Sequence, residues 1–419
     1  MAIHPILSAL RRHKAGTVLI TLQIALTLAV VCNALFIISG RLEKVARPSG
    51  LDERNLLMVA TSHAGLNANT AAGKVALEAA IRGDLAALRQ LPDVADAYET
   101  NSLSLSNIPW YLGLKLSADA RSGQPGGFFN ADEHTLATLG LRLVAGRNFR
   151  AAEIGAHDQL GVLEPPVIIV TRHMADGLFP KGDALGKQVY FGGGATKPST
   201  IIGVVERMQT ANSQSERDSI TWNSILVPAY LLNSARYYVV RAKPGRLAAA
   251  MRSVPAALYA QDPLRVIPDG EGEDAGVRSF AQIRVQAYRG DLVLAQLMSV
   301  ISVILLAVTA AGIVGLSSFW VGQRRKQIGV RRALGATRRD ILGYFHAENL
   351  LISLGGVVIG TVMAIGLNLW MVTQYEMARL PLLDVAIGAM TLLLLGQGAV
   401  LVPALRASRV SPVEATRSV

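Results

Sequence analysis

The sequence predicts an α-helical membrane domain of four transmembrane helices, with a large α+β extracytoplasmic domain inserted between the first and second helices. Three observations lead to this prediction. Four long segments carry no charge, basic residues gather in the short segments at one end of these spans, and a long stretch of mixed composition separates spans one and two. Charged residues make up 17% of the chain, below the fraction of about a quarter that soluble domains usually have.

Four segments are long and apolar enough to cross a bilayer, which takes about 20 apolar residues. They are residues 15–40, 292–322, 349–372 and 385–405. Basic residues precede the first span, as in a secretory signal, but its 26 uncharged residues exceed the ~7–15 of a signal core. We therefore expect an uncleaved anchor. The single cysteine, Cys32, lies in this span and is expected to be a small buried side chain.

The distribution of charge predicts the topology. Residues 1–14, 323–348 and 406–419 contain 13 basic and 3 acidic residues, whereas the rest of the chain contains 28 basic and 27 acidic ones. Basic residues near spans stay on the cytoplasmic side. We therefore expect both termini and the 323–348 loop in the cytoplasm, and residues 41–291 and the short 373–384 loop outside it.

Residues 41–291 are predicted to fold as an α+β domain of two lobes. Alternating and apolar runs predict strands at 55–62, 94–100, 165–171, 199–206, 224–230 and 237–242, and helices at 71–91 and 246–260. These elements fall at both ends of the domain around a middle insert at about 105–222. We therefore expect one lobe formed by both ends and another formed by the insert.

The second span is longer than one bilayer requires, since the uncharged residues 292–323 would form a helix of ~48 Å. Residues 277–297 contain no proline and one interior glycine, Gly290. This composition predicts a continuous helix that begins in the outer domain and enters the membrane as a stalk.

No motif for catalysis or for cofactor binding is found in the sequence. In KGDALGK (181–187), Lys181 stands where a phosphate-binding loop needs glycine, and Gln188 replaces the Ser or Thr that would hold Mg²⁺. Zinc motifs such as HExxH and the nucleophile motif GxSxG are lacking as well. We therefore expect no enzyme activity, cofactor or metal on this chain. The spans also lack the charged residues that proton-driven transporters use.

The most distinctive segment is QRRKQIGVRRALGATRRDIL (323–342), which carries seven basic residues before its first acid, Asp340. On a helical projection of 324–335, arginines surround Ile328 and the reverse face is mostly apolar. Gly335 can end this helix, and Thr337 with Asp340 forms a capping-box pattern for a second one. The loop is therefore predicted to be a helix, a sharp turn and a helix at the cytoplasmic membrane surface.

Three roles compete for this basic loop. Topogenic charge with binding to anionic lipid headgroups explains some of the arginines. Nucleic-acid binding is disfavoured because no aromatic residue lies between 321 and 343. Docking of a protein is favoured, because attraction to lipid alone would not require Gly335, Thr337 and Asp340 at those positions.

The third span carries a ridge of small residues, Gly356, Gly360 and Ala364. Small residues at this spacing let two helices approach closely. The ridge predicts helix packing or dimerisation.

The segment RRKQIGVRRALGATRRDIL resembles the cytoplasmic signature of FtsX-like ABC permeases, R-x-x-E-I-G-I-R-K-A-L-G-A followed by Ile. The matching residues are Arg324, Ile328, Gly329, Arg331, Ala333, Leu334, Gly335, Ala336 and Ile341. The ending PALRASRVSPVEATR (403–417) is similar to that of the family. LRLVAGRNF (141–149), the stretch 167–189 and IIGVV (201–205) resemble the outer domain of macrolide-exporter (MacB)-type permeases.

The resemblance implies a dimeric permease of the bacterial inner membrane, paired with a second copy or a paralogue. It implies no ATPase domain here, with ATP and Mg²⁺ held by a separate ABC ATPase, and possibly a periplasmic adaptor and an outer-membrane channel as further partners. The ATPase is expected to dock on the 323–348 loop, with Ile328 and Leu334 as anchors. The expected docking residues are Arg324, Arg325, Gln327, Ile328, Gly329, Arg331, Arg332, Ala333, Leu334, Gly335, Ala336, Thr337, Arg338 and Asp340.

Gln327 departs from the family pattern, which has Glu at this position, so an ion pair that depends on Glu would be missing. The expected function is export from the periplasm or envelope, with ATP-driven motion passed to the outer domain. Release of lipoproteins from the inner membrane is one alternative. A membrane sensor or activator of an envelope enzyme, without transport, is another.

Overall fold

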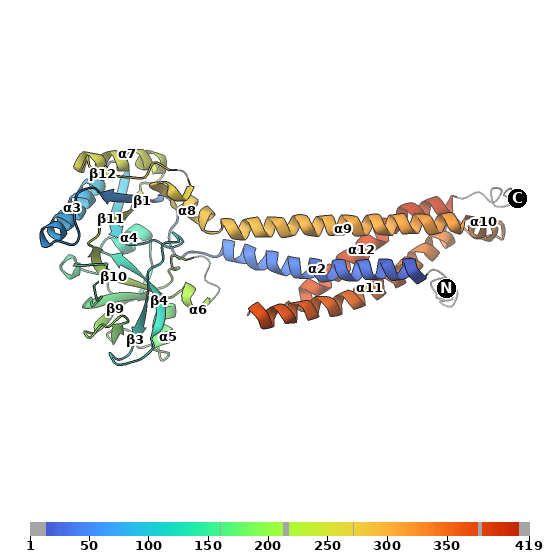
Figure 1. The fold of residues 1–419 in the computed structure, drawn as a ribbon, viewed down its shortest axis with the longest axis horizontal. Helices are drawn as coiled ribbons and strands as arrows, with labels where there is room; N and C mark the ends of the chain where they lie inside the picture. Colours follow the sequence, from blue (N-terminus) through green and yellow to red (C-terminus); the bar gives the residue numbers. More distant parts are fainter. Residues whose placement is uncertain (1–13, 160, 213–217, 271, 376–378, 410–419) are drawn as a thin grey trace. The chain divides into compact units, whose positions relative to one another are not determined.

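The computed structural model describes residues 14–159, 161–212, 218–270, 272–375 and 379–409 (Figure 1). The chain divides into two compact units. The β-rich unit is Arg47–Arg289, and the helical unit is formed by the residues on either side of it. Most of the predicted N-terminal segment, the last ten residues of the C-terminal segment and residues 376–378 of the short loop lie outside the described residues.

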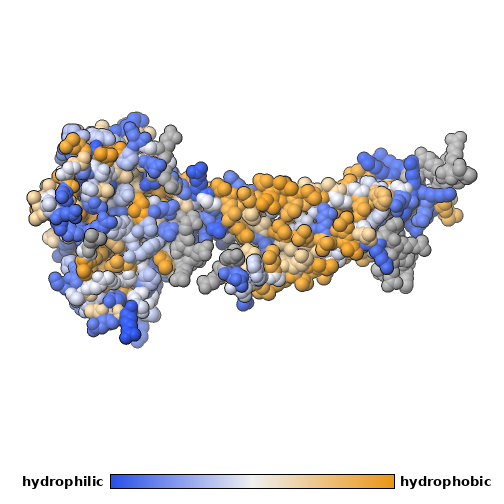
Figure 2. All heavy atoms as spheres, in the orientation of Figure 1, coloured by the Kyte–Doolittle hydropathy of each residue, from blue (hydrophilic) through white to orange (hydrophobic). Residues whose placement is uncertain are grey.

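In its described residues, the helical unit has four long helices and one short helix. The long helices are α2 (Lys14–Ala46), α9 (Arg289–Gln323), α11 (Arg338–Tyr375) and α12 (Leu382–Ser408), and the short one is α10 (Arg325–Ala333). In the part of the chain that the structure describes, four helices are long and apolar enough to cross a membrane, as predicted. Apolar side chains cover their middle on the face shown in Figure 2.

Helices α2 and α11 approach each other at the predicted small-residue ridge. A Cβ added to Gly356 would lie 2.8 Å from Cβ of Ile24, and one added to Gly360 would lie 2.8 Å from the carbonyl oxygen of Ala25. Ala364 is fully buried, and its carbonyl oxygen accepts a hydrogen bond of 3.2 Å from Nδ2 of Asn33. The ridge therefore packs against the first span of the same chain, which leaves it unavailable to a second copy.

The β-rich unit contains two sheets (Figure 1). The first is antiparallel, in the order β12 (Arg265–Val266), β1 (Leu56–His63), β11 (Ala235–Ala242) and β2 (Val94–Thr100), with β13 (Val277–Ser279) also paired to β1. Helices α3 (Ala71–Gln90) and α7 (Leu247–Gln261) share one apolar core with this sheet. Its strands come from both ends of the unit.

The second sheet is mixed and is built from residues 111–231. Its order is β4 (Gln124–Ala131), β3 (Tyr111–Lys115), β8 (Gln188–Phe191), β9 (Ser199–Val205), β7 (Val167–Thr171), β10 (Ser224–Leu231) and β6 (Gly155–His157), with β5 (Leu143–Gly146) beside β9. Three short helices belong to the same stretch: α4 (Thr135–Leu139), α5 (Arg172–Leu178) and α6 (Asp218–Thr221). The sequence did not predict the short strands β3, β5, β6 and β8, nor the eight-residue β4.

The prediction of a continuous stalk helix over 277–297 is wrong. Its first residues form β13, and α8 (Phe280–Ala287) then ends at Tyr288, which has φ −103° and ψ 8°. Tyr288 is buried, its hydroxyl accepts a 3.1 Å hydrogen bond from Nε2 of Gln209, and the guanidinium of Arg284 lies over its ring. Since no proline is present, these tertiary contacts account for the break.

Candidate functional site

The loop between the second and third long helices folds as a helical hairpin of α10 and the first turns of α11. Gly335 has φ +101°, a conformation that glycine adopts without the cost of a Cβ. Its amide donates to the carbonyl of Arg332, and the amide of Ala336 donates to that of Arg331, each at 3.1 Å. This pair of hydrogen bonds is a Schellman motif, which ends α10.

The second helix of the hairpin begins with the predicted capping box. The amide of Thr337 donates to Oδ2 of Asp340 at 2.9 Å, and the amide of Asp340 donates to Oγ1 of Thr337 at 3.3 Å. These reciprocal bonds satisfy backbone donors at the start of α11. Both ends of the turn are therefore fixed by local hydrogen bonds.

One face of α10 packs against α11. Nη1 of Arg324 donates to both carboxylate oxygens of Glu348, at 3.0 and 2.9 Å. Ile328 is 5% exposed and belongs to an apolar cluster that includes Phe345. The guanidinium of Arg331 lies 5.1 Å from the centroid of the ring of Tyr344. Part of the arginine face around Ile328 therefore packs on α11, although Arg325 and Arg331 remain exposed.

The opposite face of α10 is exposed and partly apolar. Val330 is 49% exposed and Leu334 is 83% exposed. Gln327 is exposed as well, and its spacing of three and seven residues places it on the same side of the helix. We call Gln327, Val330 and Leu334 the exposed stripe. An apolar side chain as open as Leu334 is suited to burial against a partner.

The two predicted anchors differ in exposure. Ile328 and Gly329 are buried inside the helical unit, which disfavours Ile328 as a docking anchor, whereas Leu334 is 83% exposed. Arg324, Arg332 and Ala336 are half-buried. The other predicted docking residues are exposed: Arg325, Gln327, Arg331, Ala333, Leu334, Gly335, Thr337, Arg338 and Asp340. Sequence reasoning missed Val330, whose exposure follows from the burial of Ile328.

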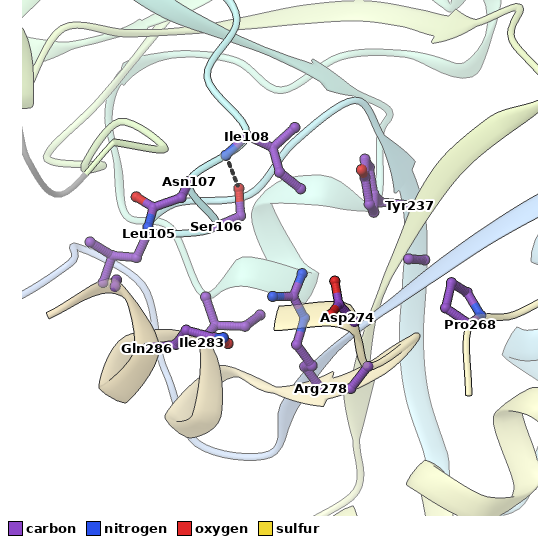
Figure 3. A pocket seen from close by; sticks show the side chains of 13 residues that line it. Leu105, Ser106, Asn107, Ile108, Tyr237, Pro268, Asp274, Arg278, Ile283 and Gln286 are labelled. Atoms are coloured by element: carbon purple, nitrogen blue, oxygen red, sulfur yellow. Dashed lines mark hydrogen bonds between the residues drawn. The ribbon is translucent and has the colours of Figure 1, made fainter. Parts of the chain in front are cut away.

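A second feature is a pocket of about 400 Å³ in the β-rich unit (Figure 3). Its walls come from residues 105–108, from Tyr237, from Asp274 and Arg278, and from α8. Leu105 and Asn107 have φ of +65° and +57°, which is uncommon for residues other than glycine. The pocket brings together polar and apolar side chains without a recognisable catalytic group. Among the described residues, no group of three or more His, Cys, Asp or Glu side chains could hold a metal ion.

Comparison with known proteins matches two family models, of which the first begins within α2 and covers most of the β-rich unit. Residues 17–257 match the MacB-like periplasmic core domain, and residues 299–412 match the C-terminal domain of FtsX-like permeases. The macrolide export ATP-binding/permease protein MacB 1/2 of Paracoccus denitrificans is 27% identical over 99% of this chain and 58% of its own length. The uncharacterized ABC transporter permease YvrN of Bacillus subtilis is 24% identical over 69% of each chain.

A crystal structure of the periplasmic region of MacB from Actinobacillus actinomycetemcomitans is 14% identical, with a TM-score of 0.34, over 56% of this chain and 92% of that one; a score this low carries no argument. The chain spans about half the length of the curated macrolide-export relatives that it matches. The periplasmic-core model alone covers more than half of the chain. The chain therefore belongs to the FtsX-like ABC transporter permeases that carry a MacB-like periplasmic core domain.

Proposed function

We propose that the chain is a permease subunit that couples ATP binding and hydrolysis by a partner ATPase to a conformational change of the β-rich unit. Family membership and the four apolar helices indicate a protein of the inner membrane. Most of the residues that match the periplasmic core domain lie in the β-rich unit. This unit has two lobes that move relative to each other during export from the periplasm or envelope. ATP and Mg²⁺ belong to the partner in this scheme.

The single observation that carries the proposal is the exposed stripe on α10. Leu334 and Val330 present apolar surface at the tip of a hairpin whose opposite face is packed and ion-paired. Exposed apolar side chains on a rigid element suit a protein partner better than a lipid headgroup, which would favour the arginines instead. Arg325, Arg331 and Arg338 are exposed cations of the same hairpin and can orient an acidic partner.

The proposed topology places both termini and the hairpin in the cytoplasm, where the ATPase is. The permease works as a dimer with a second copy or a paralogue, and a periplasmic adaptor and an outer-membrane channel complete the assembly. The relatives named for macrolide export make efflux the favoured process, and the substrate of this chain is left open.

Replacement of Leu334 by Asp tests the docking site. The full-length chain is purified in nanodiscs, and its binding to a candidate ABC ATPase from the same organism, and the stimulation of that ATPase, are measured. Truncation of a central interface residue costs about 2 kcal/mol, so affinity is expected to fall about thirtyfold. ATPase stimulation is expected to fall with it.

Val75→Asp is the matched control, because Val75 is an apolar helical residue 69% exposed in the β-rich unit. It introduces the same negative charge in the other structural unit, more than two hundred residues before the hairpin in the sequence. ATPase binding is expected to remain unchanged. Unchanged binding by Leu334→Asp, or a wild-type chain that does not bind the ATPase, would overturn the proposal.

A further inference from the structure

The residue that joins α9 to α10 is tied to α11. Arg324 lies between the last residue of α9, Gln323, and the first residue of α10, Arg325, and its φ of −96° and ψ of 10° depart from helical values. Its guanidinium binds both carboxylate oxygens of Glu348, which lies within α11. Three helices therefore meet at one ion pair.

Both members of this pair are shielded from water. The side chain of Arg324 is 12% exposed and that of Glu348 is 3% exposed. A buried pair gains little net stability over apolar residues of similar size, because removal of both charges from water offsets their attraction. Stability alone therefore gives little reason for an ion pair here. Its directional hydrogen bonds fix the orientation of Arg324, and so the angle between α9 and α10. An apolar contact would restrict that angle less, because it has no preferred direction.

The pair lies at the opposite end of α10 from the turn. Leu334, at the docking end, is separated from Arg324 by the length of α10, and the intervening Ile328 packs on α11. The end of α10 that is distant from the exposed stripe is therefore fixed to α11 by the hydrogen bonds between Arg324 and Glu348. A movement of α10 would change the geometry of this ion pair.

We propose that Arg324 and Glu348 are positioning residues that transmit the movement of a docked partner from α10 to α9 and α11. This inference rests on the proposed function, because α10 has no movement to transmit without a docked ATPase. It removes Arg324 from the docking surface and gives it a role in coupling. Glu348, which belongs to no sequence motif described above, becomes its counterpart.

Two double variants test the pair in the full-length chain. Arg324→Glu with Glu348→Arg exchanges the charges and keeps the hydrogen bonds. Arg324→Met with Glu348→Leu replaces the pair by apolar side chains of similar volume, which buried sites tolerate. Binding of the same candidate ABC ATPase and stimulation of its ATP hydrolysis are measured separately for each double variant.

Both double variants are expected to bind the ATPase with wild-type affinity. The exchanged pair is expected to keep stimulation near the wild-type value, and the apolar pair to lose about tenfold, a loss usual for uncoupled sites. Full stimulation by the apolar pair, with binding intact, would show that the ion pair is only structural and would overturn the inference. Failure of the exchanged pair to stimulate, while folded and bound, would overturn it as well.

The control is Arg89→Glu, which breaks a pair of similar length and burial in the β-rich unit, where Nη2 of Arg89 lies 2.9 Å from Oδ2 of Asp132. It is expected to lower the melting temperature without separating binding from stimulation. If the wild-type chain does not bind the ATPase, or if Leu334→Asp binds it as tightly as the wild type does, the docking proposal is contradicted. If the apolar pair both binds and stimulates the ATPase normally, this inference alone is contradicted.

Discussion

Nη1 of Arg41 lies 2.6 Å from Oδ1 of Asp291, which joins α2 to the first turn of α9. The two side chains differ in exposure, 27% for Arg41 and 2% for Asp291. The Arg41→Ala variant leaves a buried carboxylate without a counter-charge, whereas Asp291→Asn leaves an arginine that water can reach. Arg41→Ala is therefore expected to cost about 3 kcal/mol and Asp291→Asn about 1 kcal/mol.

Thermal unfolding of the full-length chain in nanodiscs checks this order. Equal losses of stability, or a larger loss for Asp291→Asn, would show that the carboxylate is hydrated despite its position. Both substitutions act on the same ion pair, so the surrounding helices are the same in the two variants.

Glu99, on β2, is predicted to make the stability of the β-rich unit fall as pH rises. It is fully buried, and its carboxylate makes no hydrogen bond of good geometry among the described residues, although the backbone of Leu231 is near enough to oppose the rise of its pKa. Burial raises the pKa of Glu99 from 4.5 to about 8, with Asp132 adding to the rise and Arg236 opposing it. The folded state therefore keeps a proton that the unfolded chain releases between these two values, so stability is lost as pH rises through this window.

Glu99→Gln removes this titration and keeps a neutral polar side chain. At pH 7 the variant is expected to be about 3 kcal/mol more stable than the wild type, with the two proteins converging near pH 4. Melting temperatures from pH 4 to 8 measure the difference. A wild-type curve parallel to that of the variant would contradict a protonated Glu99.

Asp84, on α3, is predicted to be a structural anion of the same sheet. Its two oxygens accept hydrogen bonds of 2.6 Å from the hydroxyl of Tyr238 and from Nη2 of Arg265. Burial alone would raise the pKa of Asp84, but His63, whose Nε2 lies 3.8 Å from Oδ2, the hydrogen bond from Tyr238 and the charge of Arg265 hold it below its ordinary value. This contribution is present above the ordinary pKa and is lost as pH falls through the folded-state value.

Asp84→Asn leaves the fully buried Arg265 unpaired and is expected to cost about 3 kcal/mol at pH 7. The variant is also expected to lose part of the acid sensitivity of the wild type. Asp158→Asn is the control, since the pair of Asp158 with Lys74 is well exposed and is worth less than about 1 kcal/mol. Similar melting temperatures for the two variants would contradict the assignment.

The sequence allowed prediction of those features that depend on neighbouring residues. The turn of the hairpin could be predicted because Gly335, Thr337 and Asp340 act within a few positions of one another. The direction of α10 could not be predicted, because it depends on Glu348 and on the apolar surface of α11. A helical projection identifies two faces but gives no indication of which one the rest of the chain covers.

The break at Tyr288 illustrates the same limit over a longer distance. Its hydroxyl is held by Gln209, 79 residues earlier in the sequence, and no local signal distinguishes it from a helix interior. The long uncharged helices were predictable from composition, whereas a strand as short as Arg265–Val266 is defined only by its pairing with β1. Local chemistry predicts elements and their ends, and distant contacts decide their orientation.

The small-residue ridge of α11 is predicted to be sensitive at Gly360. A Cβ there would lie 2.8 Å from the carbonyl oxygen and 2.9 Å from Cα of Ala25, so α2 would have to move away. Gly360→Ala is expected to destabilise the helical unit by about 1–3 kcal/mol. Gly366→Ala is the control, because nothing lies within 4 Å of its added Cβ. Equal melting temperatures for the two variants would show that α2 is free to shift.

Gly335 is predicted to be required for the hairpin because of its backbone conformation. No atom lies within 4 Å of a Cβ added there, so Gly335→Ala meets no clash, but its φ of +101° is unfavourable for any residue with a Cβ. The cost of a left-handed conformation is about 1–2 kcal/mol, which is expected to open the turn and speed amide exchange over 325–340. Gly322→Ala, in the last turn of α9 with no atom within 4 Å of the added Cβ, is expected to leave exchange unchanged or slower. Because the exposed stripe is held in place by this turn, Gly335→Ala is expected to weaken ATPase binding as well, and normal binding with fast exchange would show that the partner docks on α10 without the hairpin.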